Sequence, residues 1–253
     1  MDQYTRRPDL YDLEHAGDTL PGEIEFYVNL ARAAGGPVLE LAVGTGRVGL
    51  EVARAGVELV GLDLSEPMLS AARHKAEAQG LSVTLLHEDM RTFDLGRKFN
   101  LIYVPFRAFL HLHTQEDQRA CLRRVAAHLA PSGRFAGNFF KPKPSLLEGN
   151  AHERYEQIKL LEDGSLLVRS YCAPNADIHE QLKEIHLLTR IYDPHGDMRS
   201  SRIDPLRLTW IHGREWRLLL ELEGFALERL DGGFNGESAG DGWEYVWVAR
   251  RAS

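Results

Sequence analysis

The sequence contains very little cysteine. Its 253 residues include only Cys121 and Cys172, and neither has a second cysteine or a histidine at metal-ligand spacing. A chain of this length buries enough apolar surface to fold without cross-links, so a disulfide framework is excluded and a reducing, cytoplasmic location is expected. The 11 histidines do not fall into the HxxxH or HExxH spacings of helical zinc sites, so no metal is expected.

Long apolar runs and excess positive charge are also absent. No stretch approaches the ~18 uninterrupted apolar residues of a membrane span, and the polar N-terminal segment lacks the apolar run of a signal peptide. Lys and Arg number 30 against 37 Asp and Glu, a formal net charge of −7. Binding to phosphate backbones needs a basic face, so the charge argues against nucleic acid. We expect neither a membrane nor a nucleic-acid partner.

Apolar runs that predict buried strands alternate with helical patterns through the first half of the chain. Strands are expected at residues 37–43, 57–64, 82–87, 99–106 and 134–140, with helices at 48–55, 66–79 and 115–129. Ser65 and Thr114 are placed to cap the second and third helices, and Pro131-Ser132-Gly133 predicts a turn. Right-handed crossover helices return the chain in one direction, so the pattern predicts a doubly wound, mostly parallel α/β sheet.

The pattern changes after Pro142 and Pro144. Residues 155–210 hold β-branched and aromatic segments separated by turns at 162–164 and 193–196, which is typical of a small antiparallel sheet. A helix at 213–223 and strands at 225–230 and 243–250 follow. Together with the five earlier strands, they predict a seven-stranded main sheet and an inserted antiparallel β subdomain.

The first predicted strand leads into a glycine turn, Gly44-x-Gly46-x-x-Gly49. Asp63, at the tip of the second strand, lies 63 − 44 = 19 residues further on, and this spacing matches the fingerprint of dinucleotide-binding proteins. Glycine lets a ligand approach the backbone, and a carboxylate there accepts hydrogen bonds from ribose hydroxyls. An NAD(P)-dependent oxidoreductase is therefore one reading, and a tight turn without a ligand is another.

Two further acids favour a different ligand. Glu40 lies inside the first strand, where a dinucleotide enzyme normally carries a small apolar residue, and a carboxylate there suits a ligand with an ammonium group. Asp89 follows the third strand. With Asp63, these acids are expected to line one crevice at the carboxyl edge of the sheet, where open α/β sheets bind ligands.

Six segments then carry a family resemblance: VLELAVGTGR (38–47), VGLDLSEPML (60–69), HEDMRTF (87–93), FNLIYVPF (99–106), LAPSGRF (129–135) and LLELEGF (219–225). In this order they resemble the class I S-adenosylmethionine (SAM)-dependent methyltransferases. YDLEHAGD, PFRAFLHL and the β-rich segment look like a bacterial branch acting on small molecules and more loosely resemble sugar-amine N-methyltransferases. Ala42 departs from the family, which most often has its first glycine at this position.

The resemblance implies a fold, a reaction and a cofactor. The fold is a Rossmann-like core, residues 1–140 plus 211–253, with residues 1–35 as an N-terminal lid. Residues 141–210 form the insertion, which covers the substrate or mediates a homodimer contact. The reaction transfers a methyl group from SAM to an amine or hydroxyl of a small-molecule acceptor, leaving S-adenosyl-L-homocysteine (SAH). A SAM-binding module without turnover is the alternative outside enzymes.

The resemblance also implies which residues hold SAM. They follow the first four strands: Glu40, Gly44, Thr45 and Gly46 around the methionine part, Asp63 at the ribose, Leu64, Met68, Asp89 and Met90 around the adenine, and Val104 and Pro105 beside the methionyl end and the acceptor. For the two methionines, ordinary core packing is the alternative.

Three residues are candidates for the chemistry itself. An amine or hydroxyl acceptor must lose a proton, and His111 is the candidate base. Arg107 is placed to bind an anionic group of the acceptor. Tyr11, on an N-terminal segment with Tyr4 and His15, offers an aromatic face that suits a sulfonium cation. The structural alternatives are a packed His111, an Arg107 paired with an acid and a Tyr11 on the packed face of a surface helix.

Overall fold

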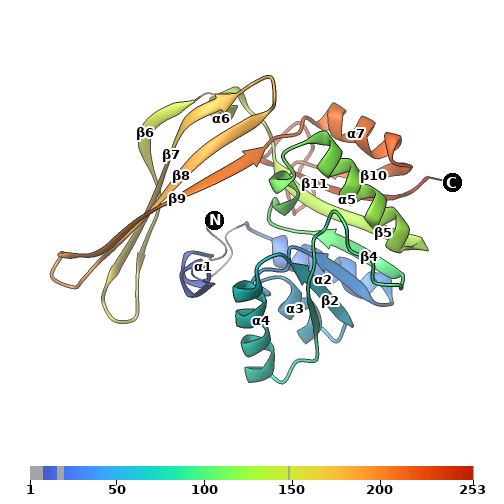
Figure 1. The fold of residues 1–253 in the computed structure, drawn as a ribbon, viewed down its shortest axis with the longest axis horizontal. Coiled ribbons are helices and arrows are strands. Elements are labelled where there is room, and N and C mark those ends of the chain that lie inside the picture. Colours follow the sequence, from blue (N-terminus) through green and yellow to red (C-terminus); the bar gives the residue numbers. More distant parts are fainter. Residues whose placement is uncertain (1–7, 16–19, 148, 253) are drawn as a thin grey trace. The chain divides into compact units, whose positions relative to one another are not determined.

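The computed structural model describes residues 8–15, 20–147 and 149–252, so Tyr4 lies outside the described residues. The chain divides into two compact units (Figure 1). Of the described residues, the larger unit contains those up to Lys141 and those from Ile211 onward, and the smaller contains those of Pro142–Trp210. Among the described residues, no helix combines the length and apolar character needed to cross a bilayer. In the same part of the chain, no cluster of His, Cys, Asp and Glu side chains is arranged to hold a metal ion.

The larger unit is built on a seven-stranded sheet with the order β10-β11-β5-β4-β1-β2-β3. The strands are β1 (Val38–Leu41), β2 (Leu59–Asp63), β3 (Thr84–His87), β4 (Phe99–Val104), β5 (Leu129–Phe140), β10 (Phe225–Asp231) and β11 (Glu244–Arg251). The first five pair in parallel, and β11 runs antiparallel to β5 and β10. The predicted mostly parallel, doubly wound sheet is confirmed.

The described helices of this unit are α1 (Pro8–His15), α2 (Glu23–Ala34), α3 (Gly49–Arg54), α4 (Glu66–Ala78), the 3₁₀ helix η2 (Ala108–His111), α5 (Gln115–His128) and α7 (Gly213–Leu222). Four of them, α3, α4, α5 and α7, begin and end within one residue of their predicted bounds, and the three others have no predicted range. The Ser65 hydroxyl accepts the Met68 N–H at 3.4 Å, and the Thr114 hydroxyl accepts the Asp117 N–H at 3.1 Å. Both predicted caps are confirmed.

The predicted turn at Pro131-Ser132-Gly133 is wrong, because this segment lies within β5. Between the pairs Phe99–Leu129 and Leu101–Arg134, β4 advances 101 − 99 = 2 residues while β5 advances 134 − 129 = 5. The extra residues of β5 make its pairing with β4 irregular. Pro, Ser and Gly are common in turns, so composition alone does not distinguish this irregular strand from a loop.

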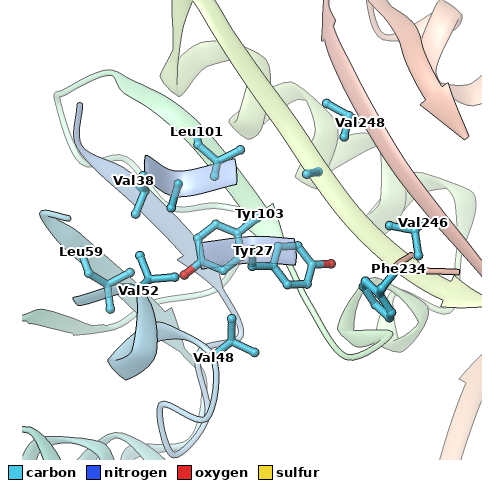
Figure 2. Close-up of a cluster of buried hydrophobic side chains, with 12 residues drawn as sticks. Tyr27, Val38, Val48, Val52, Leu59, Leu101, Tyr103, Phe234, Val246 and Val248 are labelled. Atoms are coloured by element: carbon cyan, nitrogen blue, oxygen red, sulfur yellow. The ribbon is translucent and has the colours of Figure 1, made fainter. Parts of the chain in front are cut away.

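A buried cluster joins α2 to the sheet (Figure 2). The Tyr27 and Tyr103 rings stack with centroids 5.2 Å apart, and Val38, Leu59 and Leu101 belong to the same cluster. Strands covered on both faces are mostly apolar, and β1 and β4 are so apart from Glu40 and Asn100. The predicted lid of residues 1–35 therefore includes one helix, α2, whose buried face belongs to the core.

The smaller unit is a four-stranded antiparallel sheet in the order β6-β7-β8-β9. Its elements are α6 (Pro144–Leu147), β6 (Asn150–Leu160), β7 (Leu166–Asp177), β8 (Leu182–Tyr192) and β9 (Met198–Thr209). The predicted turns close with the bonds Gly164 N–H to Leu161 C=O, 3.0 Å, and Gly196 N–H to Asp193 C=O, 2.9 Å. The inserted antiparallel subdomain is confirmed.

Candidate functional site

The glycine turn leaves β1 through left-handed backbone. Ala42 has φ +56°, Gly44 φ +56° and Gly46 φ +80°. A Cβ on Gly46 would lie 2.7 Å from Leu50 Cγ, whereas a Cβ on Gly44 would meet only the Met68 terminal methyl, 3.9 Å away. Gly46 is therefore required by helix packing, and Gly44 leaves open space beside the turn. Ala42 adopts the conformation for which the family more often has glycine.

Asp63 joins this turn to the next strand. One of its oxygens, Oδ2, accepts the Gly44 N–H at 2.8 Å, and the other, Oδ1, accepts the Ser65 N–H at 2.8 Å. The side chain is partly exposed, and a carboxylate oxygen accepts more than one hydrogen bond. Asp63 therefore fixes two turns at the carboxyl edge and retains acceptor capacity toward solvent.

Glu40 lies beneath the glycine turn. It is 1% exposed, and its Oε2 accepts the Tyr103 hydroxyl at 2.8 Å. A Cβ on Gly49 would lie 2.5 Å from the same oxygen, so the glycine there makes room for the carboxyl group. Burial raises the pKa of Glu40 to about 8, and the Tyr103 hydrogen bond only partly opposes this effect. At neutral pH the group is therefore largely protonated unless a cation approaches it.

Helix α1 is tied to the glycine turn by an acid that the sequence reading missed. Asp12 Oδ1 accepts the Thr45 hydroxyl at 2.6 Å, and its two oxygens accept Lys75 Nζ at 3.0 and 2.9 Å. Thr45 is fully buried. The only sequence signal is the position of Asp12 beside Tyr11 in YDLEHAGD.

The aromatic residues of α1 reach the loop that follows β4. The Tyr11 and His15 rings stack with centroids 4.4 Å apart, and His15 meets the Phe106 ring edge to face at 5.0 Å. The Arg47 guanidinium lies over the same Phe106 ring, 4.4 Å from its centroid. Burial raises the pKa of Tyr11 to about 12, although the Arg47 charge opposes the shift. Tyr11 therefore stays a neutral phenol in this aromatic cluster.

The loop after β4 holds two consecutive residues in the left-handed region, Phe106 at φ +54° and Arg107 at φ +63°. The Phe106 N–H donates to Glu23 Oε1 at 2.9 Å, and Arg47 pairs with the other oxygen of Glu23. Arg107 Nε donates to Glu244 Oε1 at 2.9 Å. Sequence reasoning identified Arg107 but neither carboxylate, because both acids come from elements distant in the chain.

Glu244 is itself part of a buried polar chain. Its Oε2 accepts Asn138 Nδ2 at 3.1 Å, and Asn138 Oδ1 accepts the Tyr27 hydroxyl at 3.0 Å. Asn138 and Tyr27 are fully buried. Arg107 is therefore anchored through its side chain to the core at β5, β11 and α2.

The residues assigned to the adenine lie beyond β2 and β3. Leu64 is 58% exposed, while Met68 is 2% exposed and packs in the core. Asp89 accepts the Arg91 N–H at 2.8 Å and Arg91 Nε at 3.0 Å. Burial of Asp89 is outweighed by these hydrogen bonds and by the Arg91 charge, which lower its pKa. Met90 next to it is partly exposed.

The remaining predicted residues follow β4. Val104 and Pro105 are buried at the strand tip, and η2 carries His111 at its last position. The structure thus joins Gly44 to Asp63 and Thr45 to α1. Arg107 pairs with an acid, as the structural alternative expected, and that acid is Glu244. The pairing of Asp89 with Arg91 was not predicted.

Known proteins resemble this chain both in sequence and in fold. Residues 38–133 match a family described as a methyltransferase domain. A dTDP-3-amino-3,6-dideoxy-alpha-D-glucopyranose N,N-dimethyltransferase of Streptomyces fradiae is 33% identical over 49% of this chain and 49% of that protein. A demethylmenaquinone methyltransferase of Thermus thermophilus is 34% identical over 54% of this chain and 61% of that protein. The chain thus spans about half of the first relative's length.

Solved structures resemble the chain over all or nearly all of its length. The CcbJ methyltransferase of Streptomyces caelestis has a TM-score of 0.83 at 28% identity, over 100% of this chain and 99% of that chain. SAM-bound CalS10, an amino pentose methyltransferase of Micromonospora echinaspora, has a TM-score of 0.75 at 24% identity, over 96% and 97% of the two chains. At 24% identity, the likeness to CalS10 is a likeness of fold alone.

Proposed function

We propose that the chain is a class I SAM-dependent methyltransferase that transfers a methyl group from SAM to an amine nitrogen of a small molecule, and the methyltransferase-domain match and the full-length structural relative support this proposal. The observation that carries the proposal is the glycine turn joined to Asp63 at the carboxyl edge of the sheet. The amine is favoured over a hydroxyl because the matched relatives include N,N-dimethyltransferases of amino sugars. A cytoplasmic location and a homodimer remain predictions.

The residues at this edge fit SAM chemically. Gly44 leaves room beside the turn, and the partly exposed Asp63 carboxylate offers acceptors to ribose hydroxyls. Leu64 presents an exposed apolar side chain suited to a purine face. Arg47 Nη1 is buried without a hydrogen-bond partner in the described part of the chain. Buried donors normally have an acceptor, and the carboxylate of a methionyl group would supply one.

The other predicted residues complete this assignment. Glu40, Thr45 and Gly46 would lie at the methionine part, and Met68, Asp89 and Met90 at the adenine. Val104 and Pro105 would border the transfer site. A cationic ammonium beside Glu40 would favour its ionised form, because an opposite charge lowers the pKa that burial has raised.

SAM, when bound, supplies an electrophilic methyl group on a sulfonium. The protein's own contribution is mainly alignment, which is worth roughly 7 to 11 kcal/mol in well-oriented systems. His111 would accept the proton of the acceptor's ammonium or the proton released on transfer. Tyr11 keeps its proton near neutral pH, and its ring face would lie against the sulfonium cation of SAM. Arg107 would bind an anionic group of the acceptor through the exposed part of its guanidinium group while Nε stays on Glu244.

Calorimetric titration and a methyl-transfer screen test the function. We expect SAH to bind, NAD and NADP to give no heat, and radiolabel to move from methyl-labelled SAM to amine acceptors. A nicotinamide response without SAH binding would establish the oxidoreductase instead. SAH binding without product from a broad set of amines, hydroxyls and amino sugars would favour the non-catalytic binding module.

A further inference from the structure

The carboxylate of Glu23 contacts two segments that the proposed function assigns to different ligands. It is fully buried at the start of α2. One oxygen pairs with Arg47, the residue that follows the glycine turn, and the other accepts the Phe106 N–H at 2.9 Å. The same Arg47 lies over the Phe106 ring. Three groups from α2, the glycine turn and the β4 loop therefore meet at one buried point.

The segment that Glu23 holds is under conformational strain. Phe106 and Arg107 both adopt positive φ, a region that is unfavourable for a residue with a Cβ atom. Such a conformation persists only where surrounding contacts maintain it. Here the contacts are Glu23 on the Phe106 backbone, Arg47 on the Phe106 ring and Glu244 on the Arg107 side chain. Loss of these contacts would favour negative φ at both residues.

Charge ties the two sides together. Glu23 is unexposed and the Arg47 side chain is 13% exposed, so neither charge is stable there without the other. A ligand that fixes Arg47 therefore also fixes the carboxylate that accepts the Phe106 N–H. Coupling between sites requires an element with two arrangements whose equilibrium both sites bias, and the Phe106-Arg107 segment, held at positive φ by contacts from both sides, is the candidate for that element.

We infer that Glu23 is a positioning residue that couples the cofactor turn at Gly44–Arg47 to the acceptor segment at Phe106-Arg107. Occupancy of the turn stabilises the strained form of the segment, so the acceptor side is organised once the cofactor is in place. The inference rests on the proposed function, because it assigns the turn to SAM. It adds a role for a carboxylate that contacts neither reacting atom.

Hydrogen exchange of the wild type with SAH as the probe is the first test. We expect SAH to slow amide exchange in a peptide covering residues 104–110 by about fivefold or more, the lower end of typical coupling between sites. A peptide within α7, residues 213–222, serves as the internal control and should not change. SAH binding with no change at 104–110 would overturn the coupling and leave the proposed function standing. Failure of SAH to bind would overturn both.

Substitution then assigns the coupling to Glu23. Glu23→Asp keeps the charge for Arg47 but is one methylene shorter, so it cannot keep both contacts at their present lengths. We expect this variant to bind SAH within about threefold of wild type, while the protection of 104–110 falls several-fold. The matched control is Glu25→Gln on the exposed side of the same helix turn, which should behave as wild type. Full protection in Glu23→Asp would overturn the role of Glu23.

Discussion

The Tyr103 hydroxyl donates a 2.8 Å hydrogen bond to Glu40 inside the fully buried space beneath the glycine turn. Even with this donor, burial holds the pKa of Glu40 at about 8. The folded protein therefore keeps the proton in a range where the unfolded chain has released it. Glu40, packed beneath the glycine turn, therefore makes the stability of the fold depend on pH.

The first prediction concerns Glu40→Gln. Between pH values of about 4.5 and 8, ionisation of Glu40 in the unfolded chain alone lowers the free energy of unfolding as pH rises, by about 1.4 kcal/mol per pH unit. Below and above this window its contribution is constant. Glutamine does not ionise, and its side-chain oxygen can still accept the hydrogen bond from Tyr103. We therefore expect the free energy of unfolding of the variant to rise relative to that of wild type as the pH goes from 5 to 8.

Urea unfolding at pH 5, 6.5 and 8 measures this difference. The control is Glu58→Gln, a change at a largely exposed carboxylate that pairs with Arg97 on the surface. Parallel pH profiles for wild type and Glu40→Gln would show that Glu40 titrates normally.

The second prediction concerns Asp63→Asn. The amide keeps one acceptor oxygen, but its NH₂ group would face either the Gly44 N–H or the Ser65 N–H. It would also lose acceptors for a ribose. We expect the Kd for SAH to rise by about 10- to 100-fold, the usual effect of losing a charge-assisted hydrogen bond. Calorimetry measures it, with Glu66→Gln on the exposed start of α4 as the control. An unchanged Kd would remove Asp63 from the cofactor site.

The parts of this architecture that the sequence predicts are those set by local rules. Alternating strands and helices require parallel pairing, and parallel pairing of β1 with β2 brings their carboxyl ends together. Gly44 and Asp63 therefore meet although 19 residues separate them. Ser65 and Thr114 cap helices because their hydroxyls lie three residues before the N–H they accept. Each of these relationships depends on spacing alone.

The contacts that the sequence does not predict depend on tertiary packing. Arg107 and Glu244 are 137 residues apart, and Phe106 and Glu23 are 83 apart. Nothing in the local pattern of either acid distinguishes it from a surface charge, because burial of a carboxylate is decided by what covers it. Strand β6 is also hard to predict from the sequence, because its residues are mostly exposed and show no clear alternation of apolar and polar side chains.

The third prediction concerns Gly49→Ala. Its Cβ would come within 2.5 Å of Glu40 Oε2 and 2.9 Å of Leu59 Cδ2, distances that require the buried carboxyl group or β2 to move. We expect a loss of about 1 to 3 kcal/mol in the free energy of unfolding, typical of overpacking, with weaker SAH binding. Gly240→Ala is the control, since its Cβ would meet only Ser238 Oγ at 3.6 Å. A stable Gly49→Ala with normal SAH affinity would show that Glu40 has room to move.

The last prediction separates general-base catalysis from alignment. His111 ends η2, four residues after the strained Arg107, and His113 follows it on the same loop. If His111 takes the acceptor's proton, His111→Ala lowers kcat by about 10² to 10⁴ with the best amine acceptor from the screen. It should leave the Kd for SAH unchanged and flatten the acidic limb of the pH–rate profile, because the group that must be deprotonated is gone. His113→Ala should leave kcat within about threefold of wild type. Wild-type turnover in His111→Ala with an unaltered profile would mean that an amine already deprotonated in solution is captured, and that proximity alone supplies the rate.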